Sequence, residues 1–259
     1  MKDLSQLYAI SNLFAALGQD DFIDQVIDLL KISTSFDDHV VLTYHPDMKP
    51  LVLHSSFANQ DLHVWDKYIQ GAYLLSPFYE YAISGNEGLV SLKEIAPDDF
   101  YDSAYYEDYF SPSHLVDEVC ITIQSDQGYC HLISLGRTSK LPKFNRRVFE
   151  TLKPIAKIII HAFKFHSRER DIIPADRVMS HQSVKQKLRS FGEDKLTARE
   201  QEVLQLLIRG YSSKESAKKL EISYETDRVH RKNIYAKLGM SSQKELLAHL
   251  IDDVLNDTH

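Results

Sequence analysis

The chain has 259 residues, of which 43% are hydrophobic and 26% are charged, as in a globular protein with one or two domains. No apolar run reaches the roughly 18 residues that a membrane-spanning helix needs, and the N-terminus has no secretory pattern. The sequence therefore predicts a cytoplasmic protein without a membrane partner. The formal net charge of −7 excludes a uniformly basic nucleic-acid binder, so any contact with nucleic acid requires a local basic patch.

Hydrophobic periodicity predicts two amphipathic helices in residues 1–30, followed by strands at 39–44 and 51–54. A helical segment near 62–82, a strand at 88–92 and a helix at 99–110 come next. Strands at 118–124 and 129–136 read as a hairpin, and a long helix occupies about 145–168. The order ααββαβαββα predicts an antiparallel sheet with helices packed against it. This arrangement resembles GAF- or PAS-like sensor domains, so residues 1–168 are expected to form a sensor and dimerisation domain.

The long helix carries one apolar stripe, formed by Val148, Leu152, Ile155, Ile159 and Phe163. We expect this stripe to pair two sensor domains in a homodimer, together with the first helix. Cys120 and Cys130 are the only cysteines and fall on two adjacent predicted strands. Without a secretion signal, both are expected to be reduced thiols in the core.

Tyrosines are concentrated between residues 64 and 110. Flat apolar rings with polar tips can line a small-molecule pocket, and they also suit a cationic or amine ligand. The alternative is that the rings only pack helices onto the sheet. The candidate ligand-binding residues are Trp65, Tyr68, Tyr73, Phe78, Tyr79, Tyr101, Asp102, Tyr105, Tyr106 and Tyr109.

The sequence lacks the motifs of several kinds of catalytic, cofactor-binding and signalling domains. There is no P-loop, no GxGxxG and no metal-ligand spacing among the histidines, so no cofactor, no metal and no enzymatic activity are predicted. The alternating strand–helix pattern of a phosphorylated receiver domain is also missing. Residues 169–192 are polar, contain Pro174 and are expected to be a linker.

Residues 193–259 carry the most specific pattern. Thr197 with Glu200, Ser212 with Glu215 and Ser242 with Glu245 have capping-box spacing; Ser223 can cap the third helix. Gly210 and Gly239 lie where two helices should end. Four short helices with tight joins, one of them basic, predict an all-α helix-turn-helix domain.

The third helix, about 223–238, separates into two faces at 100° per residue. Asp227, His230, Ile234 and Leu238 share one face, whereas Glu225, Arg228, Val229, Lys232 and Ala236 share the other. Two cations beside an apolar side chain suit the major groove of DNA, where cations reach phosphates or guanine and the apolar group meets a thymine methyl. Residues 209–237 hold 8 Lys+Arg against 4 Asp+Glu, so positive charge gathers here.

Over about 55 residues this segment resembles the LuxR-type DNA-binding domain of bacterial transcription regulators. The motifs LTAREQEVLQLL, Gly210, KES with Ala217, and NIYAKLG carry the resemblance. It implies DNA contacts from the second and third helices, and a regulator that binds a two-fold operator as a dimer. The implied DNA-binding residues are Ser212, Ser213, Lys214, Glu225, Arg228, Val229, Arg231 and Lys232.

The segment departs from the family pattern at three positions. Ser213 replaces Asn, Ser216 replaces a core Ile, which should loosen the second helix, and Asp227 replaces a core Val. Arg231 follows Asp227 by four residues, so we hypothesise that an Asp227–Arg231 pair replaces an apolar contact.

The acyl-homoserine-lactone receptors of the same family carry a Trp, a Tyr and an Asp-Pro in their ligand domain. Here Trp65, Tyr68 and Ser76-Pro77 are a loose echo, but the aspartate is missing. The sequence thus predicts a regulator of transcription that binds double-stranded DNA, responds to a small-molecule effector and contacts RNA polymerase if it activates. A constitutive or protein-controlled regulator with a degenerate sensor, or a lactone-type quorum receptor, are the alternatives.

Overall fold

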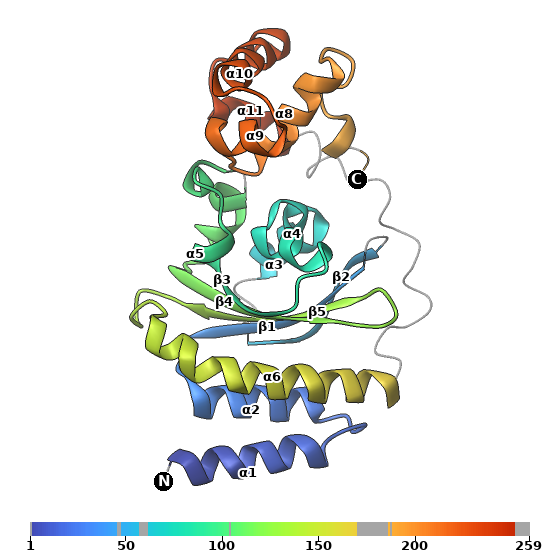
Figure 1. Ribbon diagram of the computed structural model, residues 1–259, viewed down its shortest axis with the longest axis vertical. Coiled ribbons are helices and arrows are strands. Elements are labelled where there is room, and N and C mark those ends of the chain that lie inside the picture. Colours follow the sequence, from blue (N-terminus) through green and yellow to red (C-terminus); the bar gives the residue numbers. More distant parts are fainter. Residues whose placement is uncertain are drawn as a thin grey trace. The chain divides into compact units, whose positions relative to one another are not determined.

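The computed structural model describes residues 2–45, 48–56, 62–103, 105–169, 186 and 188–251 (Figure 1). Most of the expected linker, residues 170–185 and 187, lies outside the described residues. The chain divides into two compact units. The first comprises residues 1–60, 81–94 and 114–179, and the second comprises residues 61–80, 95–113 and 180–259. Within the described residues no helix is long and apolar enough to cross a membrane.

The first unit contains a five-stranded antiparallel sheet in the order β2-β1-β5-β4-β3. Its strands are β1 (Asp38–His45), β2 (Met48–Ser55), β3 (Gly88–Ser91), β4 (Asp117–Gln124) and β5 (Cys130–Arg137). The predicted hairpin of the last two strands pairs Val119 with Leu135 and Ile121 with Ile133. This sheet with its helices confirms the predicted α+β, GAF/PAS-like architecture.

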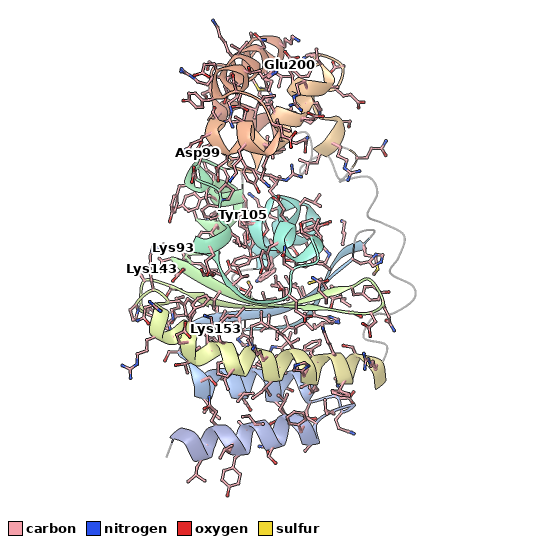
Figure 2. The ribbon with its side chains drawn as sticks, in the orientation of Figure 1. Lys93, Asp99, Tyr105, Lys143, Lys153 and Glu200 are labelled. Atoms are coloured by element: carbon pink, nitrogen blue, oxygen red, sulfur yellow. The ribbon has the colours of Figure 1, made fainter. Side chains whose placement is uncertain are left out.

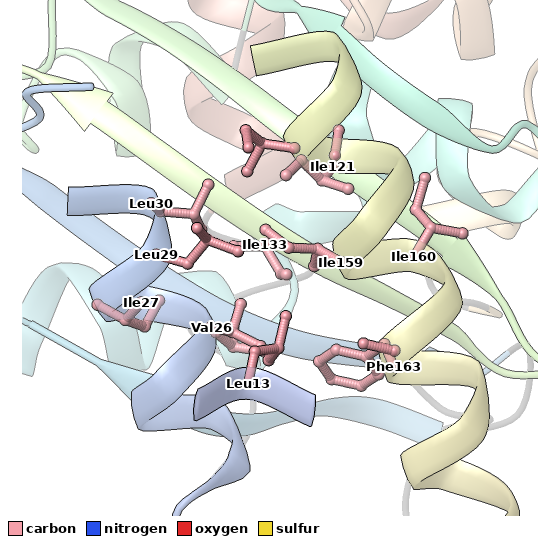
Figure 3. Packing of buried hydrophobic residues seen from close by; sticks show 14 of the residues in the cluster. Leu13, Val26, Ile27, Leu29, Leu30, Ile121, Ile133, Ile159, Ile160 and Phe163 are labelled. Carbon is pink, nitrogen blue, oxygen red and sulfur yellow. The ribbon is translucent and has the colours of Figure 1, made fainter. Parts of the chain in front are cut away.

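Three helices cover one face of the sheet: α1 (Lys2–Ala15), α2 (Phe22–Ser33) and α6 (Arg146–Glu169). Figure 1 shows α2 and α6 against the sheet and α1 outside them. The core of this unit joins Leu13, Leu30, Ile133, Ile159 and their neighbours between the helices and the strands (Figure 3).

The apolar stripe of α6 does not face a partner chain. Leu152, Ile155, Ile159 and Phe163 are buried within their own unit, and Val148 packs at the edge of the same core. The prediction that this stripe pairs two sensor domains was therefore wrong. The apolar side of α6 instead covers one face of the chain's own sheet.

Both cysteines are free thiols, as predicted. The strand register explains why they do not meet, because Cys120 lies opposite Ser134 whereas Cys130 lies opposite Gln124. Burial raises the pKa of Cys120 well above its ordinary value and that of Cys130 to about 12, so neither thiol ionises near neutral pH.

The two helical segments expected at 62–82 and 99–110 are each interrupted. The first becomes α3 (Leu62–Gln70), the 3₁₀ turn η2 (Ala72–Leu75) and α4 (Pro77–Ile83). Gly71 is a poor helix former and Pro77 has no N–H to donate, which accounts for both breaks. The second contains only short turns, η3 (Phe100–Asp102) and the π-helical η4 (Tyr106–Phe110), and α5 (Leu92–Ile95) precedes it.

Four helices end the described chain: α8 (Ala198–Ile208), α9 (Ser213–Lys219), α10 (Tyr224–Leu238) and α11 (Gln243–Ile251). The capping boxes Thr197–Glu200 and Ser212–Glu215 are both complete, as predicted. Ser223 Oγ accepts from Thr226 N at 3.0 Å. Ser242 Oγ accepts from Glu245 N at 3.2 Å, but the Glu245 carboxylate bonds to Ser241 instead of closing the box. Gly239 has φ 72°, the left-handed conformation that glycine adopts without strain.

Candidate functional site

The two predicted faces of α10 are present. Asp227 and Ile234 are fully buried on the inner face. Glu225, Arg228, Lys232 and Ala236 are exposed on the outer face, together with Val229, which is 57% exposed. Two exposed cations beside an exposed apolar side chain can reach phosphates, base edges and a thymine methyl, so the outer face of α10 has the groups that a contact with DNA needs.

Arg231 lies on the inner side of α10, and its guanidinium is hydrogen-bonded to other groups of the same domain. Its side chain is only 12% exposed and its Nε donates to Asp227 Oδ2 at 2.7 Å. Its Nη2 donates to the carbonyl of Tyr211 at 2.6 Å and to Ser216 Oγ at 2.9 Å. We therefore remove Arg231 from the candidate DNA-contacting residues, because its guanidinium holds α10 to the start of α9.

The same contacts explain two of the departures from the family pattern. Ser216 and Asp227 are both fully buried, and Arg231 links them. The pairing of Asp227 with Arg231 is thus confirmed. The expectation that Ser216 loosens α9 stays a prediction, and its hydroxyl accepts a hydrogen bond that ties α9 to α10. A buried polar network replaces an apolar contact here.

A second ion pair braces α10 against α8. Lys237 Nζ lies 2.6 Å from Oε2 of Glu200, which is labelled in Figure 2. Glu200 also accepts from the backbone N–H of Thr197 at 2.8 Å. The hydrogen bond from Lys237, with those from Thr197, lowers the pKa of Glu200 to about 2. Glu200 thus carries its charge at neutral pH, and the start of α8 is fixed to the end of α10.

Sequence reasoning missed one residue of the outer face. Tyr224 is exposed at the first position of α10, and the Arg228 guanidinium lies 5.7 Å from the centre of its ring. The signal was present in the sequence, since an aromatic residue four positions before an arginine lies on the same side of a helix. Among the candidates on α9, Lys214 is exposed, whereas Ser212 and Ser213 are half-buried and Ser212 caps the helix.

Most of the aromatic candidates form one buried ring cluster. The rings of Tyr68 and Tyr109 are 4.7 Å apart, Tyr73 and Tyr79 are 5.1 Å apart, and Tyr105 lies 5.2 Å from Tyr109. Trp65 joins at 5.4 Å from Tyr68. Tyr105, labelled in Figure 2, brings the short turns after residue 100 into this cluster, and Phe78 is likewise buried.

The remaining candidates lie at the edge of this cluster. Tyr101 and Tyr106 contact each other at 5.0 Å around Phe100, whose ring lies 6.3 Å from that of Tyr105. Tyr101 and Asp102 are exposed. Asp102, one of the predicted ligand-binding residues, therefore does not place a carboxylate inside the ring cluster.

Ser76 belongs to the Ser-Pro pair that the sequence offers only as a loose echo of an Asp-Pro. It is buried directly before Pro77, and its hydroxyl has no hydrogen-bond partner among the described residues. A buried hydroxyl without a partner costs free energy unless another group satisfies it. Ser76 was not among the predicted site residues, although the Ser-Pro pair was visible in the sequence.

A further buried polar group lies on the sheet. Glu118 Oε1 accepts a short hydrogen bond from Ser134 Oγ, and Cys120 Sγ lies 3.9 Å from the same oxygen. Burial raises the pKa of Glu118 to about 7. Within the described part of the chain, no group of three or more His, Cys, Asp or Glu side chains is placed to hold a metal ion.

Comparison with known proteins assigns the C-terminal helices to a domain family. Residues 194–250 match the model described as bacterial regulatory proteins, luxR family. A predicted HTH-type transcriptional regulator of the exeN 3′ region of Aeromonas salmonicida is 26% identical over 166 residues, which cover 60% of this chain and 85% of the relative. The transcriptional regulatory protein MctR of Rhizobium johnstonii is 41% identical over 61 residues, 24% of this chain and 28% of that protein.

Among solved structures, the VqsR LBD domain from Pseudomonas aeruginosa has a TM-score of 0.56 at 24% identity. The match covers 64% of this chain and 97% of the VqsR chain. At this identity the likeness shows the fold alone. Capped short helices with an exposed cationic helix agree with the predicted helix-turn-helix domain. Residues 194–250 form a DNA-binding domain of the LuxR type, and a sensor-like domain precedes it.

Proposed function

We propose that this protein binds a two-fold operator as a homodimer and contacts DNA through the outer face of α10. Glu225, Arg228, Val229 and Lys232 form this face, and Ser212, Ser213 and Lys214 lie at the start of α9. The observation that carries the proposal is the exposure of Val229 between two cations that the fold does not bury. We assign the chain as a sensor and dimerisation domain (1–168), a linker (169–192) and a DNA-binding domain (193–259).

The proposed roles of the α10 residues differ. Arg228 and Lys232 would contact guanine edges or phosphates, and Val229 would meet a thymine methyl. Arg231 and Lys237 would act indirectly, since both hold α10 in place. A protein that regulates transcription acts where the chromosome is, so we place it in the cytoplasm. An activator of this kind would also contact RNA polymerase, and no catalytic step is assigned to it.

DNA enrichment tests the proposal. The purified protein is incubated with fragmented genomic DNA of its source, and the retained fragments are sequenced. An imperfect palindrome should be enriched by the wild-type protein and lost with Arg228→Ala/Lys232→Ala. The matched control is Lys153→Ala/Lys157→Ala, which removes two exposed cations from α6. Equal enrichment by the Arg228→Ala/Lys232→Ala variant would refute the assigned face.

We further propose that a small-molecule effector binds the sensor domain near the ring cluster. The unsatisfied hydroxyl of Ser76 supports this proposal, because a ligand with a donor or acceptor would complete its hydrogen bonding. Since Ser76 cannot supply a carboxylate, an acyl-homoserine lactone is the less favoured ligand. The effector proposal applies to Trp65, Tyr68, Tyr73, Phe78, Tyr79, Tyr105 and Tyr109; Tyr101, Asp102 and Tyr106 lie outside the buried cluster.

A constitutive or protein-controlled regulator is the second candidate. It is favoured by the ring-to-ring contacts at 4.7 to 5.4 Å, since rings that already pack on one another need no ligand to fill the core. Thermal shift with a deproteinised metabolite extract separates the two candidates. The extract should raise the melting temperature of the wild-type protein but not that of Ser76→Ala. No rise in either protein would favour the constitutive regulator.

A further inference from the structure

The outer side of α1 is an apolar stripe that the described chain leaves uncovered. Leu4, Leu7, Tyr8 and Phe14 are 61%, 63%, 70% and 46% exposed. At 100° per residue these four side chains, with Ser11 and Ala15 between them, fall within about 120° of the helix circumference. We define these six residues as the α1 stripe.

The opposite side of α1 is already in use. Ala9, Leu13 and Ala16 are buried in the core of the first unit, and Gln6 Nε2 donates to Ser33 Oγ on α2 at 3.0 Å. The helix therefore has a fixed rotation on α2, and the α1 stripe points outward. Figure 1 shows α1 as the outermost layer of this unit, on the side away from the sheet.

The composition of α1 is unusual for an exposed surface. No charged residue occurs from Leu4 to Gln19. A solvated helix face normally carries charged or polar side chains, whereas the centres of protein–protein interfaces are depleted in charge and enriched in aromatic residues. Leu4, Leu7, Tyr8 and Phe14 thus form a group on one helix, whereas the other exposed large apolar side chains of the described residues are divided among several elements.

We propose that the α1 stripe pairs with the α1 stripe of a second copy of this chain and forms the sensor-domain dimer. The proposal rests on the proposed function in one respect, since a two-fold operator calls for two copies. The α6 stripe cannot serve instead, because it is buried within its own unit. Ser11 is a small residue at the middle of the stripe, which lets two helices approach closely.

The area of the stripe agrees with a second copy as its occupant. With about 150–250 Å² for each aromatic side chain, the four large residues leave on the order of 450 Å² of apolar surface open per copy. A symmetric pair would cover about 900 Å² of it. Because about 65% of a homodimer interface is apolar, the whole interface would bury about 1,400 Å², within the range of stable complexes.

Sedimentation of the full chain without DNA tests the pairing. The wild-type protein is expected to sediment as a dimer at micromolar concentration. Leu7→Glu places a charge on both sides of a symmetric interface and should weaken the dimer roughly a hundredfold. Its fold should be unchanged by circular dichroism, because Leu7 is exposed. Thr151→Glu, on the exposed side of α6, is the matched control and should remain a dimer.

Disulfide trapping gives an independent measurement. Both natural thiols are buried, so an added surface cysteine is the reactive one. Oxidation should cross-link Ser11→Cys between two copies, while Lys153→Cys on α6 should stay uncross-linked. A monomeric wild-type protein, or a Leu7→Glu variant with unchanged dimer affinity, would overturn the proposal and assign the stripe to a different partner. Neither experiment contains DNA, so failure of operator binding would leave both results unaffected.

Discussion

The network of Arg231, Asp227 and Ser216 gives the sharpest test of how the DNA-binding domain is held together. Asp227→Val removes the carboxylate and leaves the Arg231 guanidinium 12% exposed with two neutral acceptors, Tyr211 O and Ser216 Oγ. Breaking a buried ion pair from one side costs about 3–5 kcal/mol. Because Arg231 keeps some access to water and two hydrogen bonds, we expect the lower end, about 3 kcal/mol.

Replacing the whole network should have a different effect. The triple change Ser216→Ile, Asp227→Val and Arg231→Leu removes every charge and restores apolar contact between α9 and α10. Replacement of a buried ion pair by packed apolar residues is often neutral or stabilising. We therefore expect the triple variant to be within about 1 kcal/mol of the wild type, even though one of its component changes is strongly destabilising.

Hydrogen exchange of the backbone amides in α8 and α10 is the suitable assay, since unfolding of a chain with two units is not a single transition. Protection in these helices should fall in Asp227→Val and return in the triple variant. If Asp227→Val kept full protection, the carboxylate would contribute nothing. If the triple variant stayed unprotected, the polar network would be needed for the fold itself.

Three further predictions concern single groups. The pKa of Glu118 is raised from its ordinary 4.5 to about 7, so the folded state binds a proton more tightly than the unfolded state. The melting temperature should therefore fall as pH rises from 4.5 to 7, and Glu118→Gln should remove that fall. The pKa of Glu200 is lowered to about 2, so its stabilisation should be lost as pH falls from 4.5 to 2, and the stability difference from Glu200→Gln should shrink over that range. Gly239→Ala should lower the free energy of opening measured by hydrogen exchange in α10 by about 1–2 kcal/mol from backbone strain alone, because an added Cβ meets nothing within 4 Å. A Gly239→Ala protein as stable as the wild type would contradict the strain argument.

The sequence predicted local structure best where short-range chemistry decides it. The caps Thr197, Ser212 and Ser223 each bond to a backbone N–H three residues away, so their spacing alone located three helices. The strand pair of residues 117–137 was equally visible, because its turn and its apolar runs are contiguous. The outer face of α10 followed from helical periodicity.

The sequence could not show which element packs against which. The stripe containing Leu152 and Ile159 is apolar whether it faces the chain's own sheet or a second chain, and only the assembled layers separate these cases. Arg231 is a partial case, since its spacing from Asp227 predicted their ion pair but did not show that the rest of its guanidinium is also used inside the domain. Its inward direction depends on the Tyr211 carbonyl, whose position no local pattern specifies.

The Arg231 network also bears on how such domains can exchange parts. Ser216 belongs to α9, whereas Asp227 and Arg231 belong to α10, and each is useful only when the others are present. An α10 helix taken from a relative with valine at the Asp227 position would meet a serine suited to a guanidinium. The exposed residues of α10 can therefore change without disturbing this network, but α9 and α10 must be inherited together.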